Sequence, residues 1–141
     1  MERIWHYEQL PAPKVDDYLK LYRCQYGNVL FAEWTGVLDA DKARNGCTAV
    51  LETLKTHSFP KILNNNTSVT GHYPGAIEWV GKVWFPGMHA LGVRYFAWVY
   101  SHEFYTQIGT DEIVKLSSKV EIQTFFEVVH AWQWLLEKGE K

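Results

Sequence analysis

The stretch Tyr95–Tyr100 constrains the fold of this chain more than any other segment. Aliphatic or aromatic residues occupy both alternating sets of its positions. A strand with that pattern is covered on both faces, as in parallel sheets flanked by helices. We therefore expect a buried strand at the centre of an α/β sheet. The stretch is far shorter than the roughly 20 apolar residues of a membrane-spanning helix, so we expect no membrane span.

The first residues predict an extra edge strand and a lead-in. Prolines and aspartates within residues 9–17 separate a short strand-like start from the body of the chain. This places a boundary between residues 1–17 and one domain over residues 18–138.

A β-hairpin is predicted at the start of that domain. Polar residues alternate with aromatic and β-branched ones over residues 18–24 and again over 29–35. Tyr26, Gly27 and Asn28 lie between the two runs and are typical of a hairpin turn.

The pattern then changes to helical spacing. Apolar residues fall at i, i+4, i+7, i+8 and i+11 from Ala43, which is one face of a helix. Asp39 or Asp41 is suited to cap this helix, and we expect it to end near His57. A short strand, Phe59–Leu63, follows it.

Three more helices are predicted from breakers and caps. Apolar residues at helical spacing begin after Pro74 and predict a helix there. This helix should kink or break at Pro86, because proline lacks an amide hydrogen and clashes with the preceding turn. The next helix begins near Ser101 and should break at Gly109–Asp111. Thr124–Glu127 has the pattern of a capping box for the last helix.

With a last strand at residues 120–123, the order is hairpin, helix, strand, helix, strand, helix, strand, helix. This alternation is typical of right-handed crossovers between parallel strands. We expect an α/β fold with a mixed, largely parallel β-sheet, crossover helices and an N-terminal hairpin.

Composition excludes several classes of protein. Fourteen basic and sixteen acidic residues give a net charge of -2, which disfavours binding to nucleic acid. Charges interrupt the first residues too early for a signal peptide. Only Cys24 and Cys47 are present, which suits reduced thiols in a cytoplasmic protein.

No catalytic or metal-binding motif is found. His102-Glu103 begins like a zinc-protease helix, but Thr106 stands where the second histidine is needed. Phosphate-binding loops and nucleophile elbows do not occur. We expect no catalytic residues, no metal and no cofactor, and a function other than that of an enzyme.

A polar stretch after Leu63 is the best candidate site, because ligands of open α/β sheets bind beyond the carboxyl ends of strands. We expect a loop from Asn64 to Tyr73 there. Either its side chains bind a ligand or accept a phosphate, or they only form turns and cap the next helix. The candidate residues are Asn64, Asn66, Thr67, Ser68 and His72.

Two tryptophans fall outside the predicted core stripes. Trp132 shares a stripe with Val128 and Leu135, so Trp134 points to nearly the opposite side. Trp79 is also off its stripe. Each ring either lies over a neighbouring loop or contacts a partner, because aromatic residues are enriched at interfaces.

Several local strings, together with the order of elements, resemble a family of uncharacterised bacterial proteins described as STAS-like, or similar to anti-sigma-factor antagonists. The resemblance covers about residues 18–136. Its strings are Trp34-Thr35-Gly36, Ile62 to Thr67, Val69-Thr70-Gly71, Glu78-Trp79-Val80, Phe96 to Ser101 and Trp134-Leu135.

The resemblance implies a STAS-like domain that binds other proteins or small ligands. In the antagonists, a serine preceded by aspartate stands at the start of the helix after the third strand and is phosphorylated. Ser68 or Thr67 matches that place here, although Asn66 and Thr67 precede Ser68 without an aspartate. A related similarity leads to CRAL-TRIO domains, which hold lipids in an apolar pocket.

The sequence favours two functions, and an enzyme of unfamiliar type, with a cluster of histidine, carboxylate and Ser68, is the third interpretation. The first is a non-catalytic regulatory or scaffolding module that binds a protein partner, or a second copy of itself, near Trp79 or Trp134. The alternative is a domain that binds a small apolar molecule or lipid in a pocket between sheet and helices.

Overall fold

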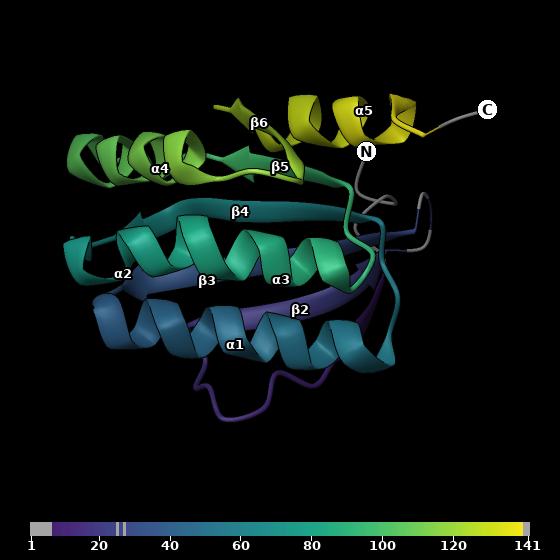
Figure 1. Ribbon diagram of the computed structural model, residues 1–141, viewed down its shortest axis with the longest axis horizontal. Helices are drawn as coiled ribbons and strands as arrows, with labels where there is room; N and C mark the ends of the chain where they lie inside the picture. The colour runs from purple at the N-terminus through teal and green to yellow at the C-terminus, as the bar shows by residue number, and fades with distance from the viewer. Residues whose placement is uncertain (1–6, 25, 27, 140–141) are drawn as a thin grey trace.

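One six-stranded sheet, with helices on both faces, organises the chain (Figure 1). The computed structural model describes residues 7–24, 26 and 28–139. The strands are β1 (Tyr7–Leu10), β2 (Leu19–Cys24), β3 (Val29–Val37), β4 (Lys61–Thr70), β5 (Tyr95–Val99) and β6 (Glu121–Phe125). The helices are α1 (Ala40–Thr56), α2 (Pro74–Trp79), the π-helix η2 (Val80–Trp84), α3 (Phe85–Ala90), α4 (Phe104–Leu116) and α5 (Val128–Glu137).

The strands follow one another across the sheet in chain order. β1, β2 and β3 pair antiparallel, and β3 to β6 pair parallel. This confirms the α/β fold with a mixed, mostly parallel sheet, the predicted edge strand and the predicted hairpin. The hairpin turn includes residues 25 and 27, which lie outside the described residues.

β5 is covered on both faces, as its sequence predicts, but it is not the central strand. Phe96 and Trp98 face one core, and Ala97 and Val99 face the other. The middle of the sheet belongs to β3 and β4. The sequence of β4 predicts only its first part as a strand, because its second half is polar.

The first three crossovers place their helices on one face of the sheet. A connection between neighbouring parallel strands has a strongly preferred hand, so a chain that always advances to the next strand crosses on the same side. α1, the α2–α3 stretch and α4 lie side by side on that face (Figure 1). We call the core beneath them the helix-side core; it includes Leu21, Leu30, Val50, Ile62, Phe85 and Phe96.

α5 covers the opposite face. Its buried residues Ala131, Trp132 and Leu135 pack on Leu63 and Val99. The expected capping box is wrong, because Thr124 lies within β6 and Glu127 is the N-cap, with no side-chain capping bond. The last strand therefore extends two residues further than its sequence indicated.

Pro86 changes the helix before it without ending it. The chain makes a π-turn over Val80–Trp84, and the amide of Phe85 donates to the carbonyl of Val80, five residues back. The wider turn removes the clash that proline makes with a regular helix. α3 then continues as far as Ala90.

Gly109–Asp111 does not break α4, in contrast to the expectation from sequence. The helix runs without interruption from Phe104 to Leu116. Thr110 is fully buried, and its hydroxyl donates to the carbonyl of Thr106 at 3.3 Å. Tertiary packing thus overrides the low helix propensity of a Gly-Thr-Asp sequence.

Candidate functional site

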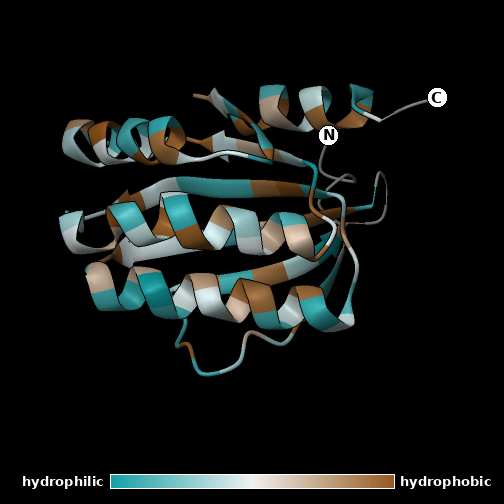
Figure 2. Cartoon of the chain, viewed as in Figure 1, coloured by the Kyte–Doolittle hydropathy of each residue, from teal (hydrophilic) through white to brown (hydrophobic). Residues whose placement is uncertain are grey.

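The polar stretch after Leu63 is a strand and not a loop. β4 continues to Thr70, so only three residues separate it from α2. It pairs with β3 over almost its whole length, with a bulge opposite the Glu33–Thr35 segment. In Figure 2 the hydrophilic run forms a teal band in the middle of β4.

Hydrogen bonds between side chains make this polar strand tolerable. Asparagine is depleted in strands, and its buried amide needs partners. The indole nitrogen of Trp34 donates to Asn64 Oδ1 at 2.8 Å, and Asn64 Nδ2 donates to Asn66 Oδ1 at 3.2 Å. On the other face, Asn65 Oδ1 accepts from the amide of Thr67 at 3.2 Å. The candidates Asn64 and Asn66 thus meet inside the helix-side core.

The remaining candidates of this stretch lie apart from that pair. Thr67 is half-buried, Ser68 is exposed, and His72 is exposed beyond the end of β4. Ser68 pairs in register with Thr35 in mid-sheet. It lies well before the start of α2 at Pro74, whereas the resemblance implies a position at a helix start.

A small cavity lies beside Asn64 and Asn66, between the sheet and helices α1, η2 and α4. Its volume is about 20 Å³. Pockets for ligands of ordinary size have volumes of about 300–1,000 Å³. The cavity is therefore far too small for a lipid. Its wall includes Trp34, Trp84, Trp98, Tyr73, Cys47 and Ile113.

The three tryptophans of this wall differ in how their indole N–H groups are used. Trp34 donates to Asn64, and Trp84 donates to the carbonyl of Cys47 at 2.9 Å. Among the described residues, Trp98 Nε1 is the one buried side-chain nitrogen or oxygen without a hydrogen-bond partner. The ring of Trp98 is only 3% exposed and lies next to Asn64 in the β4–β5 register.

Sequence reasoning missed these aromatic neighbours. The sequence pattern indicates nothing more than ordinary core residues at these positions, and all four are indeed buried: Trp34, Tyr73, Trp84 and Trp98. The sequence signal that indicates such neighbours is the Asn-Asn-Asn run directly after the apolar Ile62 and Leu63. Buried amides require donors, and indole N–H groups are the donors that an aromatic core can supply.

The titratable groups of the cavity wall stay neutral. Burial raises the pKa of the Tyr73 hydroxyl to about 12, with a smaller upward effect of Cys47 and an opposing hydrogen bond with Thr110. Burial also raises the pKa of the Cys47 thiol well above its usual value. Neither group carries charge near neutral pH, so neither is poised for proton transfer or nucleophilic attack.

A second polar cluster lies at the carboxyl edge of the sheet. Glu103 Oε1 accepts from the amide of Gly71 at 3.0 Å and from the hydroxyl of Thr106 at 2.6 Å. Ser101 Oγ donates to the carbonyl of Val69 at 2.6 Å and accepts from the amide of Glu103 at 2.9 Å. The bonds from Thr106 and Gly71 lower the pKa of the fully exposed Glu103 carboxyl.

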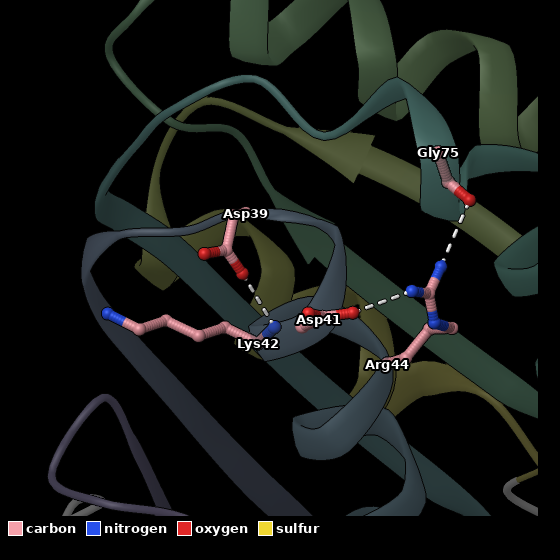
Figure 3. Close-up of polar contacts among 5 residues, drawn as sticks. All are labelled: Asp39, Asp41, Lys42, Arg44 and Gly75. Atoms are coloured by element: carbon pink, nitrogen blue, oxygen red, sulfur yellow. Dashed lines mark hydrogen bonds and ion pairs between the residues drawn. The ribbon is translucent and has the colours of Figure 1, made fainter.

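The starts of α1 and α2 are tied together at the same edge (Figure 3). Asp39 caps α1 by accepting from the amide of Lys42 at 2.8 Å, which confirms one of the two predicted caps. Arg44 bonds Asp41 at 2.8 Å and the carbonyl of Gly75 at 3.1 Å. These contacts fix the segment that follows β4.

Large apolar side chains are exposed beyond the ends of β5 and β6. Phe104 is 66% exposed, Tyr105 67% and Phe126 65%, and Ile108 is also exposed. We call these four residues the aromatic rim. Phe126 stacks on Tyr100 with ring centroids 4.8 Å apart, and the Tyr100 hydroxyl donates to Asp111 on α4 at 2.5 Å.

The two tryptophans proposed as partner surfaces are half-buried within the chain. Trp79 packs against the helix-side core. Trp134 lies between Tyr95 and Phe125, with ring centroids at 6.2 and 5.8 Å. Lys138 Nζ lies 5.3 Å from the Trp134 ring centroid.

Over residues 7–24, 26 and 28–139, no group of three or more His, Cys, Asp or Glu side chains is arranged to hold a metal ion. No helix in this part of the chain has both the length and the apolar character needed to cross a membrane. In comparisons with known proteins, neither a family model nor a curated protein matches the chain.

Proposed function

We propose that this chain is a non-catalytic regulatory or scaffolding module that binds another protein at the aromatic rim. The observation that carries the proposal is the exposure of Phe104, Tyr105 and Phe126, each about two-thirds exposed. The rings of Phe104 and Tyr105 contact each other, with centroids 5.7 Å apart, and contiguous exposed apolar patches mark interaction sites. In open α/β sheets, ligands also bind beyond the carboxyl ends of the strands, which is the edge where the rim lies.

Charge narrows the chemistry of the partner. Residues 100–114 and 120–137 contain no lysine or arginine but six acidic residues, Glu103, Asp111, Glu112, Glu121, Glu127 and Glu137. A partner segment that carries apolar side chains together with lysine or arginine complements this surface, and like charge disfavours an acidic segment. We therefore propose a basic, amphipathic protein segment as the ligand of the rim.

The rim replaces Trp79 and Trp134 as the proposed contact surface. Both tryptophan rings already pack on neighbours within the chain. Their burial contributes to the fold, whereas the rim side chains bury little surface in the isolated chain. A lipid or small apolar ligand between the sheet and the helices is not favoured, because the cavity there is only about 20 Å³.

A STAS-like relationship and a cytoplasmic location belong to the same proposal. The mostly parallel sheet and the two free, buried cysteines support them. The Ser68 side chain is exposed, so phosphorylation of this residue is also part of the proposal. Mass spectrometry after incubation with serine kinases tests this point: phosphate on Ser68 or Thr67 would support it, and phosphate elsewhere, or none, would contradict it.

The partner chemistry is tested with two synthetic peptides that share the same leucine pattern. One carries lysine and arginine between the leucines, and the other carries glutamate. We expect the basic peptide to shift the backbone amide NMR signals of residues 103–108 and 126, and the acidic peptide to leave them unchanged.

Matched variants locate the contact. The double substitution Phe104→Ser and Phe126→Ser should weaken binding of the basic peptide at least about tenfold, the loss of roughly 1.4 kcal/mol expected from one contact residue of moderate strength. Val83→Ser is the control, since Val83 is 50% exposed on η2, away from the rim. Equal binding of both peptides, or signal shifts centred on Trp79 or Trp134, would contradict the proposal. So would a homodimer in sedimentation that Phe104→Ser dissociates, because the rim would then bind a second copy.

A further inference from the structure

Three irregular features meet at one place in the helix-side core. The cavity of about 20 Å³ is lined by Asn64 and Asn66 of the polar strand. The π-helix η2 contributes Val80 and Trp84 to its wall. Trp98, whose buried indole nitrogen has no partner among the described residues, lines it as well.

We propose that this cavity is a binding site for one internal water molecule, which accepts a hydrogen bond from Trp98 Nε1. A buried N–H group without a partner is costly, and buried polar groups are nearly always satisfied by protein or by ordered water. Trp98 is 3% exposed, so bulk solvent does not supply that partner.

The size of the cavity suits a single water molecule. A site needs at least about 10–15 Å³ of such volume to hold one, and about 20 Å³ is available here. A molecule of several heavy atoms needs more space. The ligand class is therefore a neutral, water-sized molecule that both accepts and donates hydrogen bonds.

Polar groups of the wall supply the other contacts that a buried water requires. Asn66 Oδ1 accepts one bond from Asn64 Nδ2 and retains a second lone pair for a donor. The Tyr73 hydroxyl, which is neutral and buried, also belongs to the wall. Internal waters typically make about three hydrogen bonds, and Trp98, Asn66 and Tyr73 provide groups for three.

The water links side chains that the side-chain hydrogen bonds of the protein leave separate. Asn66 is already joined through Asn64 to Trp34 on β3. A water bound to Trp98 and Asn66 extends this chain of bonds to β5. The polar core would then run continuously across three adjacent strands.

A crystal structure at about 1.5 Å resolution or better tests the proposal directly. We expect one density peak in the cavity, at a hydrogen-bond distance of about 2.7–3.2 Å from Trp98 Nε1. A second crystal, pressurised with xenon, distinguishes a hydrated cavity from an empty one, because empty apolar cavities take up xenon. A cavity without water density, or one that fills with xenon, would overturn the proposal.

Solution NMR provides a second test that needs no crystal. The indole N–H of Trp98, identified by its loss in Trp98→Phe, should show a cross-relaxation peak to a long-lived water. The indole N–H of Trp84, bonded to Cys47, is the internal reference and should show a weaker peak. Absence of a water peak at Trp98 in the native protein would show that the nitrogen is unsatisfied.

Discussion

The aromatic residues of this chain serve two regions in opposite ways. Around Asn64, Trp34 and Trp84 are almost completely buried, and their N–H groups donate to polar partners inside the core. At the aromatic rim, rings of similar size are about two-thirds exposed. Burial of the tryptophans stabilises the fold, whereas the rim side chains contribute a favourable free energy only when a binding partner buries them. Residue type alone does not distinguish them; register and position in the fold do.

The strongest test of this contrast is a pair of truncations. Trp34→Ala should lower the free energy of unfolding by about 3–5 kcal/mol, because it removes a buried ring and leaves Asn64 Oδ1 without its donor. Phe126→Ala should change it by no more than about 0.5 kcal/mol, since the ring is 65% exposed. Urea unfolding followed by circular dichroism measures both. Similar losses in the two variants would show that the rim is part of the core.

A smaller effect is expected when only the polar partner is removed. Asn64→Leu keeps the branched shape of the side chain but leaves the buried Trp34 N–H unpaired and removes the donor to Asn66, at a cost of about 1–3 kcal/mol. Adding Trp34→Phe should recover part of the loss, because the unpaired donor disappears. A double-mutant cycle that shows no coupling would contradict the importance of this bond.

Two helical glycines should respond to alanine with opposite signs. At Gly46 in α1, a Cβ would lie 2.4 Å from Cη2 of Trp34, so Gly46→Ala should destabilise the fold by about 1–3 kcal/mol. At Gly109 in α4, the nearest atom is Ile77 Cδ1 at 3.8 Å. Gly109→Ala should therefore stabilise the chain by about 0.5–1 kcal/mol through helix propensity. Thermal unfolding of both variants checks the signs; a stabilised Gly46→Ala would mean that α1 can move away from the sheet.

The smallest effect concerns the exposed carboxylate beside the rim. Hydrogen bonds from Thr106 and Gly71 lower the folded-state pKa of Glu103 below its ordinary value of 4.5. Its stabilising contribution is therefore present above that value and is lost as the pH falls through the lowered pKa. Glu103→Gln should be less stable than the native chain at pH 7, with the difference shrinking in acid.

An NMR titration provides the control for this carboxylate. Thr106→Val removes the first of the two donors to Glu103 and should raise its pKa toward 4.5. The amide signal of Gly71, which donates to Glu103, should follow the same titration. A pKa that does not change in Thr106→Val would assign the shift to another cause.

Sequence patterns predict the regular parts of this fold well. The hairpin, the first helix with its Asp39 cap, and the strand covered on both faces all follow from local periodicity and capping. Helix α4 was predicted to break because its Gly-Thr-Asp sequence is locally unfavourable, whereas burial of Thr110 holds the helix together. Local preference cannot report such tertiary compensation.

The candidate site was predicted only in part for the same reason. Asn64 and Asn66 were identified as unusual, but the sequence could not show that Trp34 lies opposite them as a donor. Without that partner, an asparagine run is typical of a loop. The exposed rim left no periodic signal, because Phe104 and Phe126 lie at the ends of elements.

The chain-ordered sheet has a consequence for how the protein is made. Each new strand pairs with the one synthesised just before it, so the sheet can grow from its N-terminal hairpin as the chain leaves the ribosome. Among the described residues, α5 is the helix that packs on Leu63, Ala97 and Val99, and this cover is added after the sheet has formed. Variants that lack α5 should therefore expose this apolar face and become substrates for chaperones and proteases.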